Sequence, residues 1–290
     1  MNVKLSIIIP YHSNPLKLER LLSSIPQLNY LEVIIVNDHG ERPKIIESFC
    51  KLLNIKCFEQ VPGKKWAGAA RNLGLKKAKG EFVIFADSDD YFINDSFVFL
   101  FQYLDYSFDL VFFRPVSIKE TGGESTRHIR YSSLIDEYLL KNDRSILYKF
   151  HPPWSKLYKR SFLLEENICF DEVIASNDVN FSLKASYFAR NNFIVDEKSF
   201  YCVTESALSL TKTKNFEVAS SRFLALCHYN DFLISKNEKN LLPMINRLLP
   251  FLIYSPVLFL DNILLCRSKG YPLFYSIFDV IRIFKFFVKK

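Results

Sequence analysis

Three carboxylates stand within four positions of the sequence, at Asp87, Asp89 and Asp90, directly after the apolar residues 82–85. Crowded carboxylates repel one another and raise one another's pKa, so a chain tolerates them most easily where a cation binds. In an extended backbone Asp87 and Asp89 would point to the same side, roughly 6.5 Å apart along the chain. Oxygen ligands at that spacing suit a hard cation, so we expect Mg²⁺ or Mn²⁺ with a nucleotide diphosphate.

A turn and an EF-hand are two other interpretations of these carboxylates. The run Asp-Ser-Asp-Asp is also good turn and N-cap chemistry. An EF-hand is excluded, because the sixth loop position holds Phe92 instead of Gly and the twelfth holds Val98 instead of Glu. The choice between a turn and a metal site therefore depends on the rest of the chain.

The composition is that of a globular protein with a large core: 290 residues, of which 49% are hydrophobic, with a net charge of +7. The basic residues are dispersed, which argues against nucleic acid as a partner and favours an anionic small molecule or an acidic membrane surface. The six cysteines form no Cys-x-x-Cys pair and are expected to be reduced thiols. The short apolar stretch at residues 5–9 stops at a proline and is not expected to act as a signal peptide.

Apolar runs and helical periodicities alternate through the first 115 residues. Strands are predicted at residues 5–9, 31–36, 56–59, 82–85 and 110–113, and helices at 16–25, 45–53 and 68–78. Residues 119–127 are predicted to form a loop. Strands that alternate with helices through short connections predict an α/β fold with a doubly wound, mainly parallel sheet. The carboxylates would then lie at the carboxyl end of a strand, where such sheets bind ligands.

From about residue 217 the pattern becomes helical, which predicts a C-terminal helical appendage at residues 217–290. Residues 248–260 are uncharged but fall short of the ~20 residues that a spanning helix needs. Residues 271–290 are predicted to form a basic amphipathic helix, which suits an anionic membrane surface better than the protein's own core. The preceding residues 1–216 would form the other, larger domain.

The sequence resembles the family 2 glycosyltransferases, which have the GT-A fold, over about residues 3–210. Single matches of this kind are weak, but their order and spacing are specific. The blocks are SIIIPY at 6–11 with 21–25, VNDHG at 36–40, GAARNLG at 68–74 with 79–81 and DSDD at 87–90, and WSKLYKR at 154–160 with SNDVNF at 176–181.

The resemblance implies that a sugar is moved, with inversion, from a nucleotide diphosphate, usually UDP, to an acceptor hydroxyl. It makes residues 1–216 the catalytic domain, with a nucleotide-sugar half at about 1–115 and an acceptor half at about 116–216. It implies that Asp89 ligates the metal and that Asp87 reaches the ribose or the metal shell. Asp38 would accept a hydrogen bond from the uracil or ribose, and Arg71 would face the nucleotide. Pro10 and Tyr11 would border the base, although Tyr11 could equally be a core aromatic at a strand end.

On the acceptor side, the resemblance makes Asp178 the base that takes the proton of the acceptor hydroxyl. The structural alternative is a carboxylate that complements a helix dipole. Trp154 could face a sugar ring or anchor the core. Asn177 stands where the family usually has Glu, which leaves the type of acceptor open, and Asn37 stands where the family often has Asp.

The expected enzyme is cytoplasmic and peripheral on the inner face of the membrane, where it would build an O-antigen, lipopolysaccharide or capsule glycan on a lipid-diphosphate-linked saccharide. Two rival interpretations stay open. A haloacid-dehalogenase-like phosphatase would use Asp87 as its nucleophile, although its motif normally lies on the first strand. A non-catalytic protein could bind a nucleotide sugar without turnover.

Overall fold

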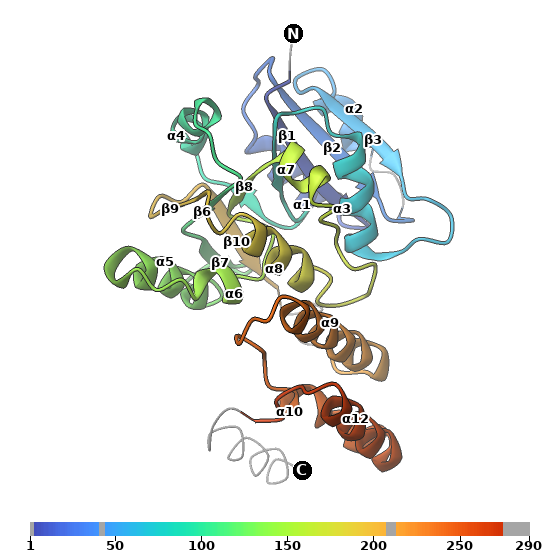
Figure 1. Ribbon diagram of the computed structural model, residues 1–290. Coiled ribbons are helices and arrows are strands. Elements are labelled where there is room, and N and C mark those ends of the chain that lie inside the picture. Colours follow the sequence, from blue (N-terminus) through green and yellow to red (C-terminus); the bar gives the residue numbers. More distant parts are fainter. Residues whose placement is uncertain (1–2, 41–43, 207–212, 275–290) are drawn as a thin grey trace.

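The computed structural model describes residues 3–40, 44–206 and 213–274. A seven-stranded sheet forms its centre, in the order β3-β2-β1-β4-β8-β6-β9, with helices on both faces (Figure 1). The strands of this sheet are β1 (Leu5–Tyr11), β2 (Leu31–Asn37), β3 (Ile55–Glu59), β4 (Phe82–Phe85), β6 (Leu110–Phe113), β8 (Lys156–Lys159) and β9 (Phe193–Asp196).

The first four strands of the sheet are parallel and connected by helices. Strands β1, β2 and β4 are buried along their whole length, as their continuous apolar sequences predict for strands covered on both faces. The helices that connect them are α1 (Pro15–Ser23), α2 (Ile45–Phe49) and α3 (Trp66–Lys77). The order β3-β2-β1-β4 reverses the winding between β1 and β4, which is where doubly wound sheets bind their ligands.

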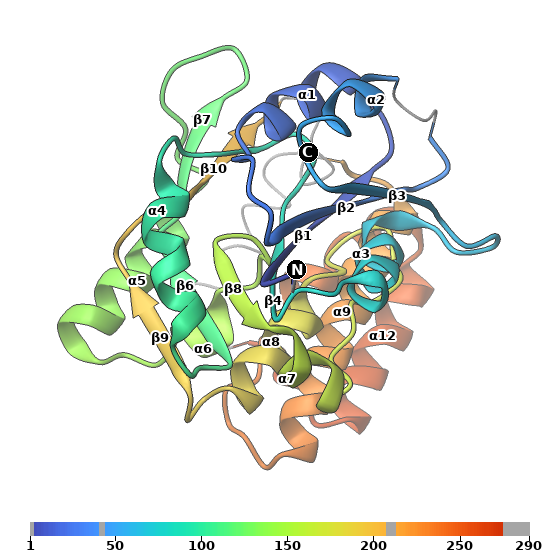
Figure 2. The ribbon, with the colours of Figure 1, turned by 90° about the horizontal axis from the view of Figure 1, so that it is seen from above.

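The second half of the sheet is mixed, because β8 runs antiparallel to both β4 and β6 while β6 and β9 are parallel. A smaller sheet is formed by β5 (Tyr91–Phe92), β10 (Tyr201–Glu205) and β7 (Val116–Lys119), and Figure 2 shows β7 and β10 beside the large sheet. The remaining helices before residue 206 are α4 (Ser96–Leu100), the 3₁₀ helix η1 (Phe101–Asp105), α5 (Ile129–Lys141), α6 (Ile146–Lys149), α7 (Arg160–Glu165) and α8 (Val179–Phe188). The predicted α/β, mainly parallel architecture is thus confirmed.

Two local predictions are corrected. The helix predicted at 45–53 ends at Phe49. The predicted loop at 119–127 is partly ordered by pairing, because β7 reaches Lys119 and Ile118 forms an isolated bridge with Glu124. Gly122 and Gly123 have φ of +84° and +87°, a backbone conformation that favours glycine, and they make the turn between the bridged residues.

The C-terminal helices form a second hydrophobic core (Figure 1). They are α9 (Phe216–Ser235), α10 (Ile245–Leu248), α11 (Phe251–Tyr254) and α12 (Pro256–Ser268). The helix predicted from residue 271 does not begin there, because residues 271–274 are not helical and Tyr271 is buried in this second core. Residues 275–290 of that prediction lie outside the described residues. Among the described helices, none combines the length and apolar character needed to cross a membrane.

Candidate active site

The carboxylates that follow β4 lie on a turn instead of an extended segment. The backbone N–H of Asp90 donates to the carbonyl of Asp87 at 3.1 Å, which closes the turn. The expected separation by alternation along a strand is therefore wrong. The turn brings Asp87, Asp89 and Asp90 together, so that one ligand oxygen of each lies within 4.8 Å of the others.

Tyr201 on β10 fixes this turn to the smaller sheet. Its hydroxyl accepts from the backbone N–H of Asp87 at 2.8 Å and donates to the Asp90 carboxylate at 2.8 Å. The backbone N–H of Thr204 donates to the other Asp90 oxygen at 2.7 Å. Asp90 is therefore buried and anchored, whereas Asp87 and Asp89 keep some exposure.

The charges on the turn are poorly balanced. Burial and then the Asp87 carboxylate raise the pKa of Asp89, and burial with both neighbouring carboxylates raises that of Asp90 well above its usual range. Within the described part of the chain, no side chain hydrogen-bonds the Asp89 carboxylate. Three convergent oxygen ligands and excess negative charge fit a divalent cation such as Mg²⁺ or Mn²⁺.

Arg71 on α3 connects the two halves of the site. Its guanidinium donates to Asp87 at 2.5 Å and to the Asn177 side-chain oxygen at 2.9 Å, and it lies over the Phe170 ring. Only 5% of Arg71 is exposed, so it is a buried cation and not a surface one. A buried charge-assisted pair of this kind fixes the positions of both partners.

Asp38 follows β2 and lies beside the end of β1. Its backbone N–H donates to the carbonyl of Tyr11 at 2.6 Å, and its carbonyl contacts His12 Nδ1 at 2.7 Å. One carboxylate oxygen, Oδ1, is buried and has no hydrogen-bond partner among residues 3–40, 44–206 and 213–274. An unpaired buried acceptor is costly unless a ligand supplies the donor. Pro10 and Tyr11 lie in the adjacent end of β1, and Tyr11 is only 2% exposed, as a core aromatic is.

Asp178 occupies the position before α8, but its side chain makes no capping hydrogen bond. Its place at the start of the helix still suits a carboxylate that complements the helix dipole, so this alternative stays open beside the role of a base. Burial raises the pKa of Asp178, and the positive charge of Arg71 opposes that rise. A partly desolvated carboxylate with a raised pKa accepts a proton more readily than an exposed one.

The two residues expected to meet the acceptor are both largely buried. Asn177 is held by Arg71 and is nearly buried. Trp154 is 3% exposed and stacks on Tyr201, with ring centroids 6.2 Å apart and planes at 19°. The structure therefore places Trp154 in the core, where it supports the tyrosine that holds the carboxylate turn.

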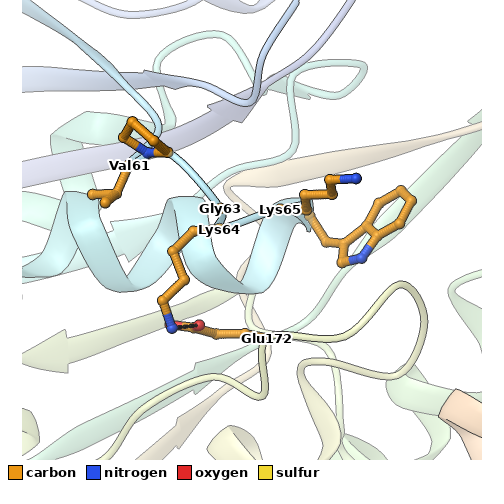
Figure 3. Close-up of a pocket in the computed structure, with 7 residues that line it drawn as sticks. Val61, Gly63, Lys64, Lys65 and Glu172 are labelled. Atoms are coloured by element: carbon orange, nitrogen blue, oxygen red, sulfur yellow. Dashed lines mark hydrogen bonds and ion pairs between the residues drawn. The ribbon is translucent and has the colours of Figure 1, made fainter.

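A cavity of about 440 Å³ opens at the start of α3 (Figure 3). Val61, Pro62, Gly63, Lys64, Lys65, Trp66 and Glu172 line it. Lys64 reaches across it to an ion pair with Glu172, which joins the β3–α3 loop to the loop before Asp178. This cavity was not predictable from the sequence, because its residues carry no pattern that separates them from a surface loop.

Fold and site together are those of a GT-A glycosyltransferase. The family model described as Glycosyl transferase family 2 matches residues 6–165, more than half of the chain, and the chain belongs to this family. Family membership overturns the phosphatase interpretation. The geometry also argues against a phosphatase, because Asp87 is paired with Arg71 and is not a free nucleophile.

The relatives include glycosyltransferases of bacterial polymers. The chain is 28% identical over 210 residues to TarS of Staphylococcus aureus, a poly(ribitol-phosphate) β-N-acetylglucosaminyltransferase, which covers 70% of this chain but only 36% of TarS. It is 24% identical over 288 residues to the GalNAc(5)-diNAcBac-PP-undecaprenol β-1,3-glucosyltransferase of Campylobacter jejuni, covering 89% of this chain and 92% of that protein.

Solved structures share the fold. TarS residues 1–349 in complex with UDP-GlcNAc superpose with a TM-score of 0.63 at 25% identity, covering 78% of this chain and 66% of that one. The mannosyltransferase PcManGT of Pyrobaculum calidifontis, in complex with GDP-Man and Mn²⁺, gives a TM-score of 0.52 at 16% identity, covering 81% and 65%.

Two residues outside the sequence motifs hold the site, and neither was predicted from the sequence. Tyr201 lies in an ordinary apolar strand. Arg20 on α1 donates to the carbonyl of Asp89 at 2.5 Å and to the Thr204 hydroxyl at 2.7 Å. Neither residue carries a local signal, because both act through contacts made across more than 60 residues of sequence.

Proposed function

We propose that the protein is an inverting hexosyltransferase that moves a sugar from a UDP-sugar to a hydroxyl of a lipid-linked saccharide. The observation that carries the proposal is that Arg71 connects the carboxylate turn, at the switch point of the sheet, to the segment before Asp178. Asp38 and the carboxylate turn would form the donor side, and Asp178 the acceptor side.

On the donor side, the orphaned oxygen of Asp38 would accept from the uracil or the ribose. Asp89, with Asp87 and Asp90 beside it, would hold Mn²⁺ or Mg²⁺, and the cation would supply charge stabilisation for the departing diphosphate. Asp87 would accept a hydrogen bond from the ribose, while Arg71 holds the Asp87 side chain in position. The UDP-GlcNAc in the TarS complex and the Mn²⁺ in the PcManGT complex support the choice of ligands.

On the acceptor side, Asp178 would take the proton of the attacking hydroxyl as the new glycosidic bond forms. The bond from the anomeric carbon to the diphosphate breaks, and its electron pair stays on the diphosphate oxygen. Attack from the side opposite the leaving group inverts the anomeric centre. Asn177 and Arg71 would keep the segment before Asp178 in register with the donor.

The acceptor would be a lipid-diphosphate-linked saccharide at the cytoplasmic face of a bacterial membrane, in the synthesis of a surface glycan such as an O-antigen or a capsule. The C. jejuni relative, whose name specifies an undecaprenol diphosphate acceptor, supports this class. The basic composition of residues 271–290 supports a membrane surface as the place of action.

A screen of nucleotide sugars tests the proposal. The purified chain is incubated with each donor, Mn²⁺ or Mg²⁺, and a lipid-diphosphate saccharide, and UDP release and product mass are measured. We expect one UDP-sugar to be consumed only with metal and to give a product of inverted configuration. Metal-dependent binding of UDP-sugars with no turnover under any condition would instead indicate a non-catalytic binding protein.

A further inference from the structure

One face of α9 contacts the segment around Asp178, at three positions of the helix: Ser221, Ala225 and His228. These residues follow one another at spacings of four and three, so they lie on the same face of the helix. We call them the α9 stripe. The stripe lies outside residues 6–165, the part of the chain that the family model matches.

Ser221 holds the middle of the loop before Asp178, which we define as residues 171–177. The Ser221 hydroxyl accepts from the backbone N–H of Ala175 at 3.1 Å and donates to the carbonyl of the same residue at 2.6 Å. Ser221 is 6% exposed and Ala175 is 7% exposed, so water does not readily replace these bonds. Ala175 comes three residues before Asp178, so the hydroxyl restrains the chain close to the proposed base.

The rest of the α9 stripe holds the two ends of the loop. The buried Asn180 amide donates to the carbonyl of Ala225 at 3.3 Å and to the Asp171 carboxylate at 2.5 Å. The same carboxylate lies 3.5 Å from His228 Nδ1. The backbone N–H of Asp171 donates to the carbonyl of Asn177 at 3.1 Å, which joins the ends of the loop to each other.

Helix α3 fixes the ends of the same loop. The Asn72 side chain exchanges two hydrogen bonds with the backbone of Phe170, at 2.9 and 2.8 Å, and Arg71 donates to the Asn177 side chain. The loop before Asp178 is therefore held by α3 at its ends and by α9 both at its ends and in its middle.

Helix α9 is itself a firm support for the loop. Figure 1 shows α9 next to α8, and Leu183 of α8 shares the second core with Phe223 and Leu226 of α9. Because α8 begins directly after Asp178, this packing fixes α9 against the far side of the proposed base.

We propose that Ser221 is a positioning residue for Asp178, so that the C-terminal helices complete the acceptor site in addition to any contact with a membrane. This inference rests on the proposed function, in which Asp178 takes the proton of the acceptor hydroxyl. A general base acts only within hydrogen-bond reach of that proton, and a misplacement of about 1 Å costs about 10²-fold in rate.

The test compares Ser221→Ala with a matched control on the same helix, Asn230→Ala. Asn230 also exchanges two hydrogen bonds with the backbone of one residue, Leu242, at 2.9 and 2.8 Å, and it is 0% exposed. Leu242 lies in the connection from α9 to α10. The control therefore loses the same kind of buried contact at a place away from the loop before Asp178.

Transfer kinetics are measured with Mn²⁺, the UDP-sugar that the nucleotide-sugar screen selects, and a lipid-diphosphate saccharide as acceptor. We expect Ser221→Ala to lower kcat by about tenfold or more while UDP affinity stays at the wild-type value, because the base is less often within reach. Asn230→Ala should lower the melting temperature at least as much and keep the wild-type kcat. A purely structural role of Ser221 predicts no such difference between the two variants.

Hydrogen exchange of backbone amides measures the restraint without any turnover. Below the melting temperatures of all three proteins, the amides of residues 171–177 should exchange faster in Ser221→Ala than in the wild type, and at the wild-type rate in Asn230→Ala. If Ser221→Ala does not fold, Ser221→Cys takes its place with smaller effects in the same direction, because a thiol is a weaker donor than a hydroxyl.

A wild-type kcat in the Ser221 variant, or an equal loss of kcat in Asn230→Ala, would overturn the positioning role and leave the proposed function intact. Unchanged exchange of residues 171–177 in the Ser221 variant would also overturn the positioning role. A wild type that transfers no sugar to any acceptor would overturn the proposed function and the positioning role together, whatever the exchange rates.

Discussion

At the scale of single residues, Asp89 is the carboxylate of the turn best placed to ligate a metal, because Asp87 is paired with Arg71 and Asp90 with Tyr201. Asp89→Asn should therefore abolish metal-dependent UDP affinity and turnover, at a loss of several kcal/mol of leaving-group stabilisation. Asp95→Asn, an exposed change on the following loop, is the control. Mn²⁺ titrations of UDP binding measure the effect, and full wild-type activity in EDTA would contradict the metal role.

Asp178→Asn is nearly isosteric but cannot take a proton. The transfer rate should fall by about 10²-fold or more while UDP affinity barely changes. Because burial raises the wild-type pKa above its ordinary 3.8, the carboxylate is ionised above the raised pKa and protonated below it. Wild-type kcat/KM should therefore decline as pH falls through that raised value, and this acid limb should vanish in the variant. A variant that loses UDP affinity instead would place Asp178 in the donor site.

Tyr201→Phe removes a hydroxyl that serves two buried groups, the Asp87 N–H and the Asp90 carboxylate. Leaving these groups unpaired should cost about 1–3 kcal/mol of stability and loosen the carboxylate turn, so metal affinity should fall as well. Tyr158→Phe is the control, because its hydroxyl donates to the carbonyl of Pro153, away from the turn. Equal metal affinity in both variants, measured by Mn²⁺ titration, would show that the turn does not depend on Tyr201.

At the scale of elements, the strands were the most predictable part of the chain. The run at 82–85 gave a strand with the predicted bounds because β4 is buried on both faces and its pattern is unbroken. The carboxylate turn was not predictable in form, because Asp-Ser-Asp-Asp suits both an extended and a turn backbone. The turn backbone is selected by Tyr201, which lies 114 residues from Asp87 along the chain. Trp154 was ambiguous for the same reason: its burial depends on distant partners.

The packing of α3 on the loop before Asp178 allows no side chain at Gly68. An added Cβ would lie 2.1 Å from the backbone carbonyl oxygen of Asp171 and 3.0 Å from Cβ of Asn177. Gly68→Ala gains up to about 1 kcal/mol of helix propensity, but the backbone clash should outweigh it and displace the acceptor loop. We expect a lower melting temperature and a raised acceptor KM.

Gly74→Ala on the same helix is the matched comparison, because its Cβ would meet only the side chain of Ile8, at 2.4 Å. It should lower the melting temperature without changing the acceptor KM. A Gly68→Ala protein with wild-type KM would show that the loop before Asp178 adjusts without cost to acceptor binding.

At the scale of the whole molecule, the second core sets where the C-terminus can be cut. Tyr271 is buried there, and the backbone N–H groups of Met244 and Ile245 donate to Pro272 and Leu273. Removal of residues 275–290 should leave the melting temperature nearly unchanged but weaken binding to anionic vesicles, since four of the basic residues lie in that segment and each contributes about 1 kcal/mol near the surface. Removal from residue 271 should also destabilise the second core.

Co-sedimentation with anionic vesicles at low and high salt, paired with melting curves, measures both effects. Salt should weaken binding of the full chain through screening. If removal of residues 275–290 lowered the melting temperature and activity together, and the full chain did not bind vesicles, the segment would be part of the protein's own core.

The two contacts of Arg71 have a consequence for protein engineering. One guanidinium holds Asp87 in the first half of the chain and Asn177 in the second. A chimera that takes its first half from one relative and its second half from another inherits one end of this bridge from each parent. Recombination should therefore keep residues 71, 87 and 177 from the same parent, because a mismatched residue 177 would leave a buried N–H donor of Arg71 without its acceptor in an otherwise compatible hybrid.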